Sequence, residues 1–481
     1  MIRRIALCTL LILALDASAF AQAQPGGIAR QIAMGGAQYT TTAGTNTVFN
    51  PFIYQDPAWA LINPAYQGWY RDYLWLNVAG GGVTSANTSE NTYGSQFGGF
   101  GIGFGKEWTV GAILSYDPSY ANALARAGGF LNQYINTARP TRFVGVTGTV
   151  IGSQPAGVLP AVEVFELITA YKVNEMSIGL ALSYGWSNKD IKVDPAPAAP
   201  TISSGEIGGR MFGIRAGAIF DLGSGNSVEG AFAFRSDKGY DRFSITGTGA
   251  PTGSSDYSAT ANEFQVSLRG RLRLSNKVNF IPYGVFRTVS ATPKEEAILS
   301  NQTSTTYDLK RNVLTYAFGG GLDYTSKTVY LAAGVSIAKD RTKDEETNPT
   351  AVILSRTTRD GRNAFPVFNV GAELYLAEWI TGRVGYYRAL GNRNLVTEVS
   401  TAAGAITTDG NLSGGSSIVG ISGYGPIPDN SLITLGLGLR VAGFALDATV
   451  SDEALRRGLG LIGASDNINT FGYITLSFSF D

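Results

Sequence analysis

The stretch Met176-Ser-Ile-Gly-Leu-Ala-Leu-Ser-Tyr-Gly-Trp-Ser187 decides the fold. Every even position carries a large apolar or aromatic side chain, from Met176 to Trp186, and every odd position carries serine, glycine or alanine. Successive residues of a β-strand face opposite sides of the sheet, so this segment has one apolar face and one small, polar face. The pattern predicts a strand with lipid or a core on one side only.

The same alternation returns in other parts of the chain. It is clear in residues 263–274, 433–441 and 474–480. The alternating segments run for roughly 10 to 15 residues, which suits a tilted membrane strand of about 9–11 residues. Strands of soluble proteins are usually about 5–6 residues long. The length therefore favours a membrane β-barrel over a soluble sandwich.

The connections between these segments alternate between short and long. Short turns are expected at residues 105–107, 173–175, 222–226, 274–277, 324–327, 377–379 and 440–443. Long polar loops are expected near 84–95, 118–160, 189–206, 241–259, 291–311, 343–363, 394–430 and 452–466. This asymmetry is typical of outer-membrane barrels. It predicts an all-β fold, an antiparallel up-and-down barrel of about 16 strands with both termini on the periplasmic side.

The first 23 residues are predicted to be a cleaved signal peptide. Arg3 and Arg4 precede an apolar run, and small residues follow with possible cleavage after Ala19, Ala21 or Ala23. This order is that of a secretory signal, and the apolar run is too short to span a bilayer. The single cysteine lies inside this segment. We expect residues 24–69 to form an N-terminal hatch and residues 70–481 the barrel, in the outer membrane of a Gram-negative bacterium.

Composition excludes several classes of function. The chain has no histidine, so catalysis and zinc binding that depend on histidine are excluded. It carries 37 basic and 37 acidic residues, which gives no reason to expect a nucleic-acid partner. No paired-carboxylate motif stands out. We predict that the protein is not an enzyme and that it has no catalytic residue, metal site or cofactor.

Three arginines share one face of a predicted strand. Arg269, Arg271 and Arg273 occupy alternate positions and are expected to face the lumen. One interpretation is an anion-selective or ligand-guiding surface. The favoured one is pairing with the plug and with lumen acids such as Glu163, Glu166, Glu229, Glu263 and Asp323.

Residues 24–69 do not follow the strand pattern. They contain Met34-Gly35-Gly36-Ala37 and, directly before the first strand, Asn63-Pro64-Ala65. In this order the two elements resemble the N-terminal hatch of the FadL/TodX outer-membrane transport proteins, a pattern that PorV-like relatives share. The resemblance implies a plug and, since that family usually has 14 strands, 14 as the alternative count. The Asn-Pro-Ala element is interpreted as a gating element or as a rigid turn.

The resemblance also implies passive uptake of hydrophobic compounds such as long-chain fatty acids or hydrocarbons. The implied partners are a small hydrophobic ligand, outer-membrane lipid and the barrel-assembly machinery. An outer hydrophobic groove is expected in loop 118–160, with a structural loop helix as the alternative. Its candidate residues are Leu124, Phe130, Leu131, Tyr134 and Ile135. Two other functions stay open: a PorV-like protein that binds exported cargo or a secretion-system partner, and a general porin.

Overall fold

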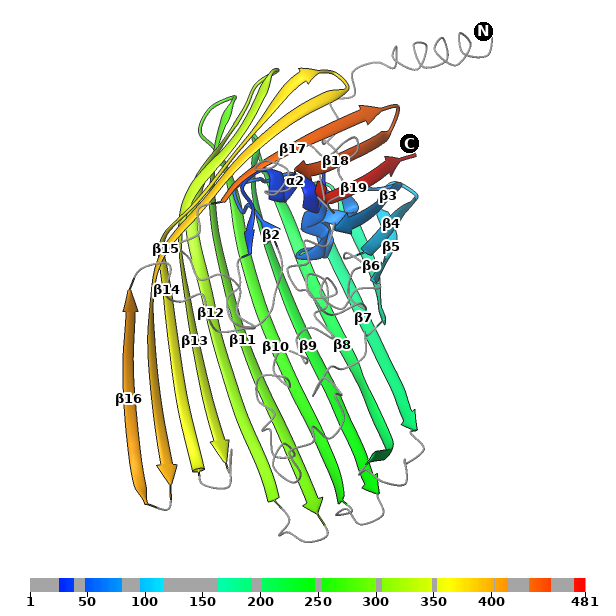
Figure 1. The fold of residues 1–481 in the computed structure, drawn as a ribbon. Helices are drawn as coiled ribbons and strands as arrows, with labels where there is room; N and C mark the ends of the chain where they lie inside the picture. The colour runs from blue at the N-terminus through cyan, green and yellow to red at the C-terminus, as the bar shows by residue number, and fades with distance from the viewer. Residues whose placement is uncertain are drawn as a thin grey trace, which may run out of the picture.

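The computed structural model describes residues 26–38, 48–79, 96–115, 163–192, 201–246, 253–299, 305–347, 353–401, 403–413, 432–450 and 471–480. These residues form a closed antiparallel barrel (Figure 1). The ring consists of β3 (Tyr73–Ala79), β4 (Gln96–Phe104), β5 (Trp108–Ser115), β6 (Glu163–Val173), β7 (Met176–Lys192), β8 (Thr201–Gly223), β9 (Asn226–Thr246), β10 (Gly253–Arg273), β11 (Val278–Leu299), β12 (Thr305–Thr325), β13 (Val329–Thr347), β14 (Ile353–Ala377), β15 (Ile380–Thr401), β17 (Leu432–Val441), β18 (Phe444–Val450) and β19 (Phe471–Ser479). The predicted count of 16 strands is confirmed, and the alternative of 14 is wrong.

The predicted strand faces and short turns are also confirmed. On β7 the side chains of Ile178, Leu182 and Trp186 are exposed on the outside, whereas Ser177 and Ala181 are buried on the inside. All seven short turns join consecutive strands at one end of the barrel, which we call the short-turn end. β19 pairs with β3 and closes the ring without a free edge. In lipid a spanning sheet must close in this way, because an unpaired edge has no water to satisfy it.

Several predicted loops are extensions of strands instead. Large parts of the segments 189–206, 241–259, 291–311 and 343–363 lie in β7 to β14. The expected loop 394–430 begins as the end of β15 and continues into β16 (Gly404–Ser413). These extensions have polar residues on both faces, so they carry no alternation that sequence reasoning can detect.

Strand β16 lies outside the ring. Near the short-turn end β15 pairs directly with β17, from Ile380 to Tyr387. Farther along, residues Asn392 to Thr401 of β15 pair with β16. Figure 1 shows β16 at the margin of the tall wall that β8 to β15 form, away from the short strands of the opposite wall. β16 therefore extends the tall wall and is not needed to close the barrel.

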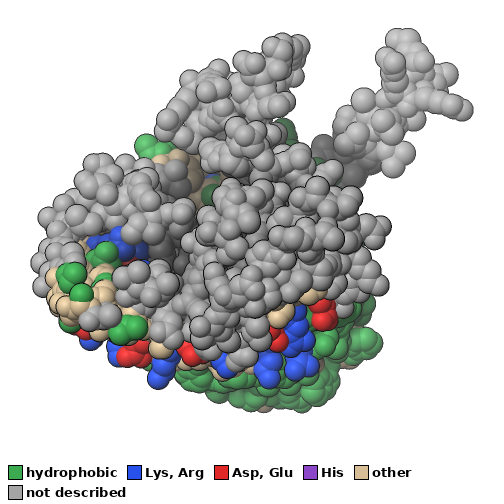
Figure 2. Space-filling model, turned by 60° about the horizontal axis from the view of Figure 1, so that its bottom comes forward, with side chains coloured by type: hydrophobic (Ala, Val, Ile, Leu, Met, Phe, Trp, Pro, Cys, Tyr) green, Lys and Arg blue, Asp and Glu red, His purple; other side chains and the backbone are tan. Residues whose placement is uncertain are grey.

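The outer face of the barrel is apolar near the short-turn end and polar beyond it. On β13 the outward positions run from Leu331 through Val335 to Ile337 and then change to Lys339 and Arg341. The neighbouring strands change in the same way, and Figure 2 shows charged side chains between the hydrophobic outer wall and the barrel mouth. An apolar band of about 25 Å on a closed barrel marks the part in lipid, as in outer-membrane proteins. Among the described residues no helix is long and apolar enough to cross a bilayer.

A short N-terminal segment, residues 26–38 and 48–70, lies inside the ring near the short-turn end, and we call it the plug (Figure 1). It contains α2 (Ile28–Ala33), the paired strands β1 (Ala37–Gln38) and β2 (Val48–Phe49), and two 3-10 helices, η2 (Pro57–Leu61) and η3 (Pro64–Gly68). Nearly all of its described side chains are buried. Helix η3 packs on β5, β6, β7 and β8, whereas α2 packs on β15, β17, β18 and β19. The plug thus reaches both sides of the ring.

Candidate functional site: the plug and the inner wall

A capping residue marks the start of each of the two 3-10 helices of the plug. The Asp56 carboxylate accepts a hydrogen bond from the Ala58 amide at 2.8 Å, and the Asn63 side chain accepts one from the Ala65 amide at 3.0 Å. Proline follows each cap, where its fixed backbone suits the first helical position and its missing N–H costs nothing. The Asn-Pro-Ala element is therefore the start of η3. Its Ala65 carbonyl accepts a hydrogen bond from the Ser177 hydroxyl of β7 at 2.8 Å.

Glycines of the wall leave room for this same helix. A Cβ on Gly179 would overlap the Pro64 backbone, and one on Gly217 would overlap the Asn63 side chain. The Asn63 amide also donates to the Ala218 carbonyl of β8 at 3.4 Å. At Gly179 and Gly217, η3 therefore lies directly against the backbone of the wall strands.

The Met-Gly-Gly-Ala element occupies a second gap of this kind. Gly35 has a φ of +71°, a left-handed conformation that favours glycine. Its carbonyl accepts a hydrogen bond from the Asn369 amide of β14 at 2.7 Å. A Cβ on Gly371 would overlap the Met34 carbonyl oxygen, and one on Gly385 would overlap the Gly35 nitrogen. Gly36 and Ala37 follow and lead into β1.

A buried chain of ion pairs joins the plug to the wall. Arg30 of α2 contacts the Glu373 carboxylate of β14 at 2.7 Å and Asp56 of the plug at 3.0 Å. Glu373 also pairs with Arg383 of β15 at 2.6 Å. Arg383 also forms an ion pair with Asp447 of β18 at 2.6 Å, although the geometry of this contact is not that of a hydrogen bond. Breaking such a buried pair by removing one partner typically costs about 3–5 kcal/mol, because the other charge is left buried.

Two more arginines of the wall hold carbonyl groups of the plug. Arg269 of β10 pairs with Glu229, donates to the Ile53 carbonyl at 3.0 Å and lies over the Trp59 ring at 3.6 Å. Arg215 of β8 pairs with Glu166 and donates to the Ala60 carbonyl at 3.1 Å. Each guanidinium neutralises a wall acid. Arg215 also satisfies the end of η2, whose last carbonyl groups have no helical partner, whereas Arg269 binds carbonyl groups of the segment before η2.

The other arginines of the predicted row lie elsewhere. Arg271 lines a cavity of about 120 Å³ between the plug and β10, β12, β13 and β14, together with Arg30, Tyr54 and Asp323. Arg273 is exposed at the short-turn end, where it donates to Ser224 and Asn276 of neighbouring turns. Of the three, the structure places Arg269 in the core of the plug contact. The predicted groove residues 124, 130, 131, 134 and 135 and the predicted signal peptide lie outside the described residues.

The charged contacts include residues that sequence reasoning did not single out. Arg30, Glu373 and Asp447 belong to segments that are hundreds of positions apart. No spacing along the chain signals that they meet. The one available signal was their position: Glu373 and Asp447 fall on the inward parity of apolar strands, where an acid needs a partner.

Burial also changes the chemistry of one plug residue. The Asp56 side chain is fully buried, and this desolvation raises the pKa of its carboxyl group to about 6, against the opposing effect of Arg30 and the Ala58 amide. Asp56 is the only Asp or Glu among the described residues of the plug, and its carboxyl group titrates close to neutral pH.

Beyond the plug the inner wall has two contrasting parts. On β9 to β15 the inward residues include many pairs of arginine and acid, such as Arg287 with Glu263 at 2.6 Å and Arg393 with Asp360 at 2.8 Å. On β5 to β8 most inward residues are small or apolar, with the ion pair of Glu166 and Arg215 among them. This second set, the apolar strip, comprises Ile113, Ile168, Ala170, Gly179, Ala181, Met211 and Gly213.

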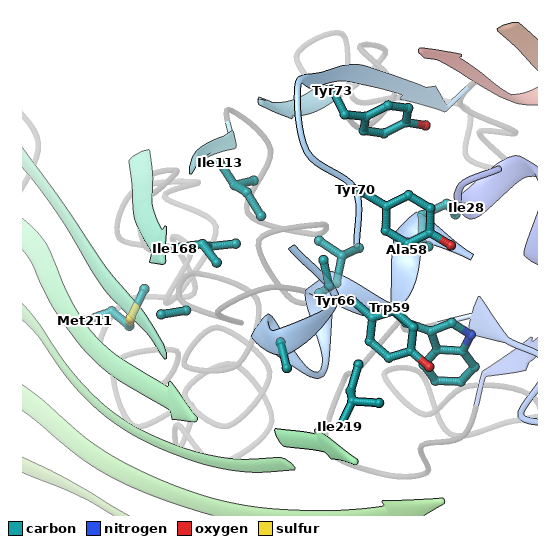
Figure 3. Close-up of a cluster of buried hydrophobic side chains, with 14 residues drawn as sticks. Ile28, Ala58, Trp59, Tyr66, Tyr70, Tyr73, Ile113, Ile168, Met211 and Ile219 are labelled. Carbon is teal, nitrogen blue, oxygen red and sulfur yellow. The ribbon is translucent and has the colours of Figure 1, made fainter. Parts of the chain in front are cut away.

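The apolar strip and the plug form one hydrophobic cluster. Ile113, Ile168 and Met211 of the strip belong to the same buried cluster as Trp59 and Tyr66 of the plug. Figure 3 shows the strip residues on the wall strands at one side and the aromatic rings of the plug at the other. On the short-turn side of η3, Gly68 and Trp69 line a depression of about 520 Å³ with residues of the β4–β5 and β6–β7 turns. Helix η3 thus stands between the strip and this depression.

No protein-family model matches the chain, and no curated protein matches it. Among solved structures, the toluene transporter TodX of Pseudomonas putida aligns over 93% of this chain and 100% of its own, with 9% identity and a TM-score of 0.39. A deletion mutant of the TodX monoaromatic hydrocarbon channel aligns over 96% and 100%, with 11% identity and a TM-score of 0.39. The ferric yersiniabactin uptake receptor FyuA of Yersinia pestis aligns over 85% and 80%, with 10% identity and a TM-score of 0.33.

Proposed function

We propose that this barrel is a plugged outer-membrane channel for the passive uptake of small hydrophobic compounds, in the manner of the FadL/TodX family. The observation that carries the proposal is the apolar strip, which faces the plug at η3 and continues into its aromatic cluster. An apolar solute gains about 25 cal/mol for each Å² removed from water. An apolar solute therefore binds the apolar strip on β5 to β8 in preference to the ion pairs on β9 to β15.

The position of η3 defines the step that the plug controls. Helix η3 separates the strip from the depression at the short-turn end, and it rests on wall glycines that permit close approach. A small displacement of this helix opens a route along β5 to β8. The packed plug argues against a general porin, since a porin needs an open aqueous lumen. The PorV-like role stays a prediction, and long-chain fatty acids and aromatic hydrocarbons are both candidate cargo.

A disulfide between η3 and the wall tests the route. The Asn63 Cγ lies 2.8 Å from the position of a Cβ on residue 217, which suits the sulfur of a cysteine pair at 63 and 217. In the Asn63→Cys/Gly217→Cys variant, oxidation should stop uptake of a radiolabelled fatty acid or toluene into proteoliposomes, and reduction should restore it. The Asn63→Cys single variant controls for the loss of the Asn63 cap, which costs about 1 kcal/mol. The Gly217→Cys single variant controls for the side chain added at position 217.

The controls decide between two outcomes. Oxidation should leave the single variants unchanged, since they have no partner thiol. Equal uptake by the oxidised and reduced double variant, with the disulfide verified by mass spectrometry, would exclude η3 as the gate. Absence of uptake by the unmodified chain for either compound class would overturn the proposed cargo.

A further inference from the structure

A row of cations lies on the outer face of β13, just beyond the apolar band. Lys339, Arg341 and Lys343 occupy alternate positions and share the outward face with Val335 and Ile337. Residues two apart in a strand are about 7 Å apart. The three charges therefore form a line that starts where the membrane-facing surface ends.

The neighbouring strands add charge of the same sign. Lys343 pairs in register with Arg359 of β14, so two cations face each other directly across the sheet. Like charges in this arrangement destabilise a strand pair. Their acidic partners lie farther from the apolar band: Lys343 contacts Glu345 at 2.5 Å, and Arg359 contacts Glu398 at 2.5 Å. Within the described residues no ion pair involves Lys339 or Arg341, the two cations nearest the band.

The surface next to these cations is aromatic. Tyr316 of β12 is the register partner of Lys339, and its ring stacks on that of Phe318 at 6.5 Å. Phe318 is 54% exposed, and Ile337 of β13 is its register partner. Aromatic side chains collect at the membrane interface, and clustered cations there bind anionic lipid headgroups. The row thus presents apolar surface to acyl chains and positive charge to a headgroup.

We propose that the outer face of β12 to β14 binds the phosphate group of an anionic lipid in the outer leaflet. Lys339 and Arg341 contact the phosphate, Lys343 and Arg359 supply further positive charge, and Tyr316 and Phe318 pack against the acyl chains. The ligand class follows from the chemistry: a lipid that joins a phosphorylated headgroup to acyl chains. The site rests on the membrane orientation of the proposed function, with the long strands facing outward. It is independent of the cargo.

The test uses the full chain in neutral detergent, with a phosphorylated lipid A as probe. Native mass spectrometry measures retained lipid for the chain and for the variant Lys339→Gln/Arg341→Gln/Lys343→Gln. The control Lys106→Gln/Lys277→Gln/Lys327→Gln removes the same charge from exposed turns at the short-turn end. The variant loses three cations near the headgroup, so we expect binding to weaken by about 100-fold in the β13 variant only.

Two comparison ligands identify the source of the phosphate. Lipid A treated with phosphatase should bind the unmodified chain as weakly as the β13 variant binds intact lipid A. Equal retention of both lipids, or equal loss in the two triple variants, would overturn the site. Competition by inorganic phosphate at the concentration of the lipid would assign a free anion instead. Hydrophobe uptake by the β13 variant should stay unchanged, so failure of this site and failure of the proposed cargo are separate results.

Discussion

At the scale of single residues, the wall accepts the plug because it lacks side chains where the two meet. One case is Gly371 of β14, whose missing Cβ makes room for the Met34 carbonyl. The strand needs no glycine for its own geometry at this position, since β14 continues on both sides. A glycine in a strand interior often marks the close approach of another backbone, and here that backbone belongs to the plug.

We predict that Gly371→Ala loosens the plug. The added methyl group overlaps backbone that cannot rotate away, and overpacking of this kind costs about 1–3 kcal/mol. Hydrogen exchange at residues 31–36 should become faster, while exchange in the barrel strands stays the same. Gly361→Ala on the same strand is the matched control, because its Cβ would meet only ordinary contact at 3.8 Å. Equal exchange in the two variants would contradict this account of Gly371.

The raised pKa of Asp56 predicts a pH dependence of plug docking. The docked carboxyl group has a pKa of about 6, and in a released plug it has its ordinary value near 3.8. The docked form thus binds the proton at higher pH, so acidification from pH 7 to pH 4 favours docking, and this contribution is lost as the pH rises through 6. Channel openings in planar bilayers should be rarer at pH 5 than at pH 7. In Asp56→Asn, which keeps a capping oxygen, this difference should disappear; a difference of the same size would assign it to another group.

At the scale of elements, a strand could be predicted from the sequence where one of its faces contacts lipid. The alternation from Met176 to Trp186 predicts β7 because one face of the strand is apolar and the other carries only small or polar residues. The same reasoning fails for the far half of β13, where Lys339 and Arg341 face outward and Asp340 and Thr342 face inward. Both faces are polar there, so the period-2 signal vanishes although the strand continues.

The plug was predictable as a segment but not in its contacts. The starts of η2 and η3 are local signals, since Asp56-Pro57 and Asn63-Pro64 are each a capping residue followed by proline as the first helical residue. The pairing of Arg30 with Glu373 joins residues 343 positions apart, and it depends on barrel closure and register. Strand β16 escaped prediction for a third reason. Its Gly404–Ser413 sequence has neither an apolar face nor a membrane to cross.

At the scale of the whole molecule, the barrel divides its lumen between two chemistries. Most ion pairs of the inner wall lie on β9 to β15, whereas β5 to β8 carry mostly apolar or small inward residues besides the pair of Glu166 and Arg215. The plug contacts both parts through different residues: Arg30 and Met34 toward β14, and η3 toward β7 and β8. The two sets of contacts are separate, so the proposed movement of η3 would leave the ion pairs of Arg30 in place.

This division predicts the behaviour of a barrel without its plug. Deleting residues 24–69 removes the groups that fill the ring, so planar-bilayer recordings should show a large, steady conductance that the intact chain lacks. On the wall that the deletion exposes, Arg269 pairs with Glu229 and Arg215 pairs with Glu166, so each exposed arginine keeps an acidic partner. Because the charges balance, the reversal potential in a KCl gradient should stay near zero. The oxidised Asn63→Cys/Gly217→Cys variant is the closed control. A deletion barrel that folds, as heat-modifiable migration would verify, yet shows no added conductance would mean that the plug is not what closes the lumen.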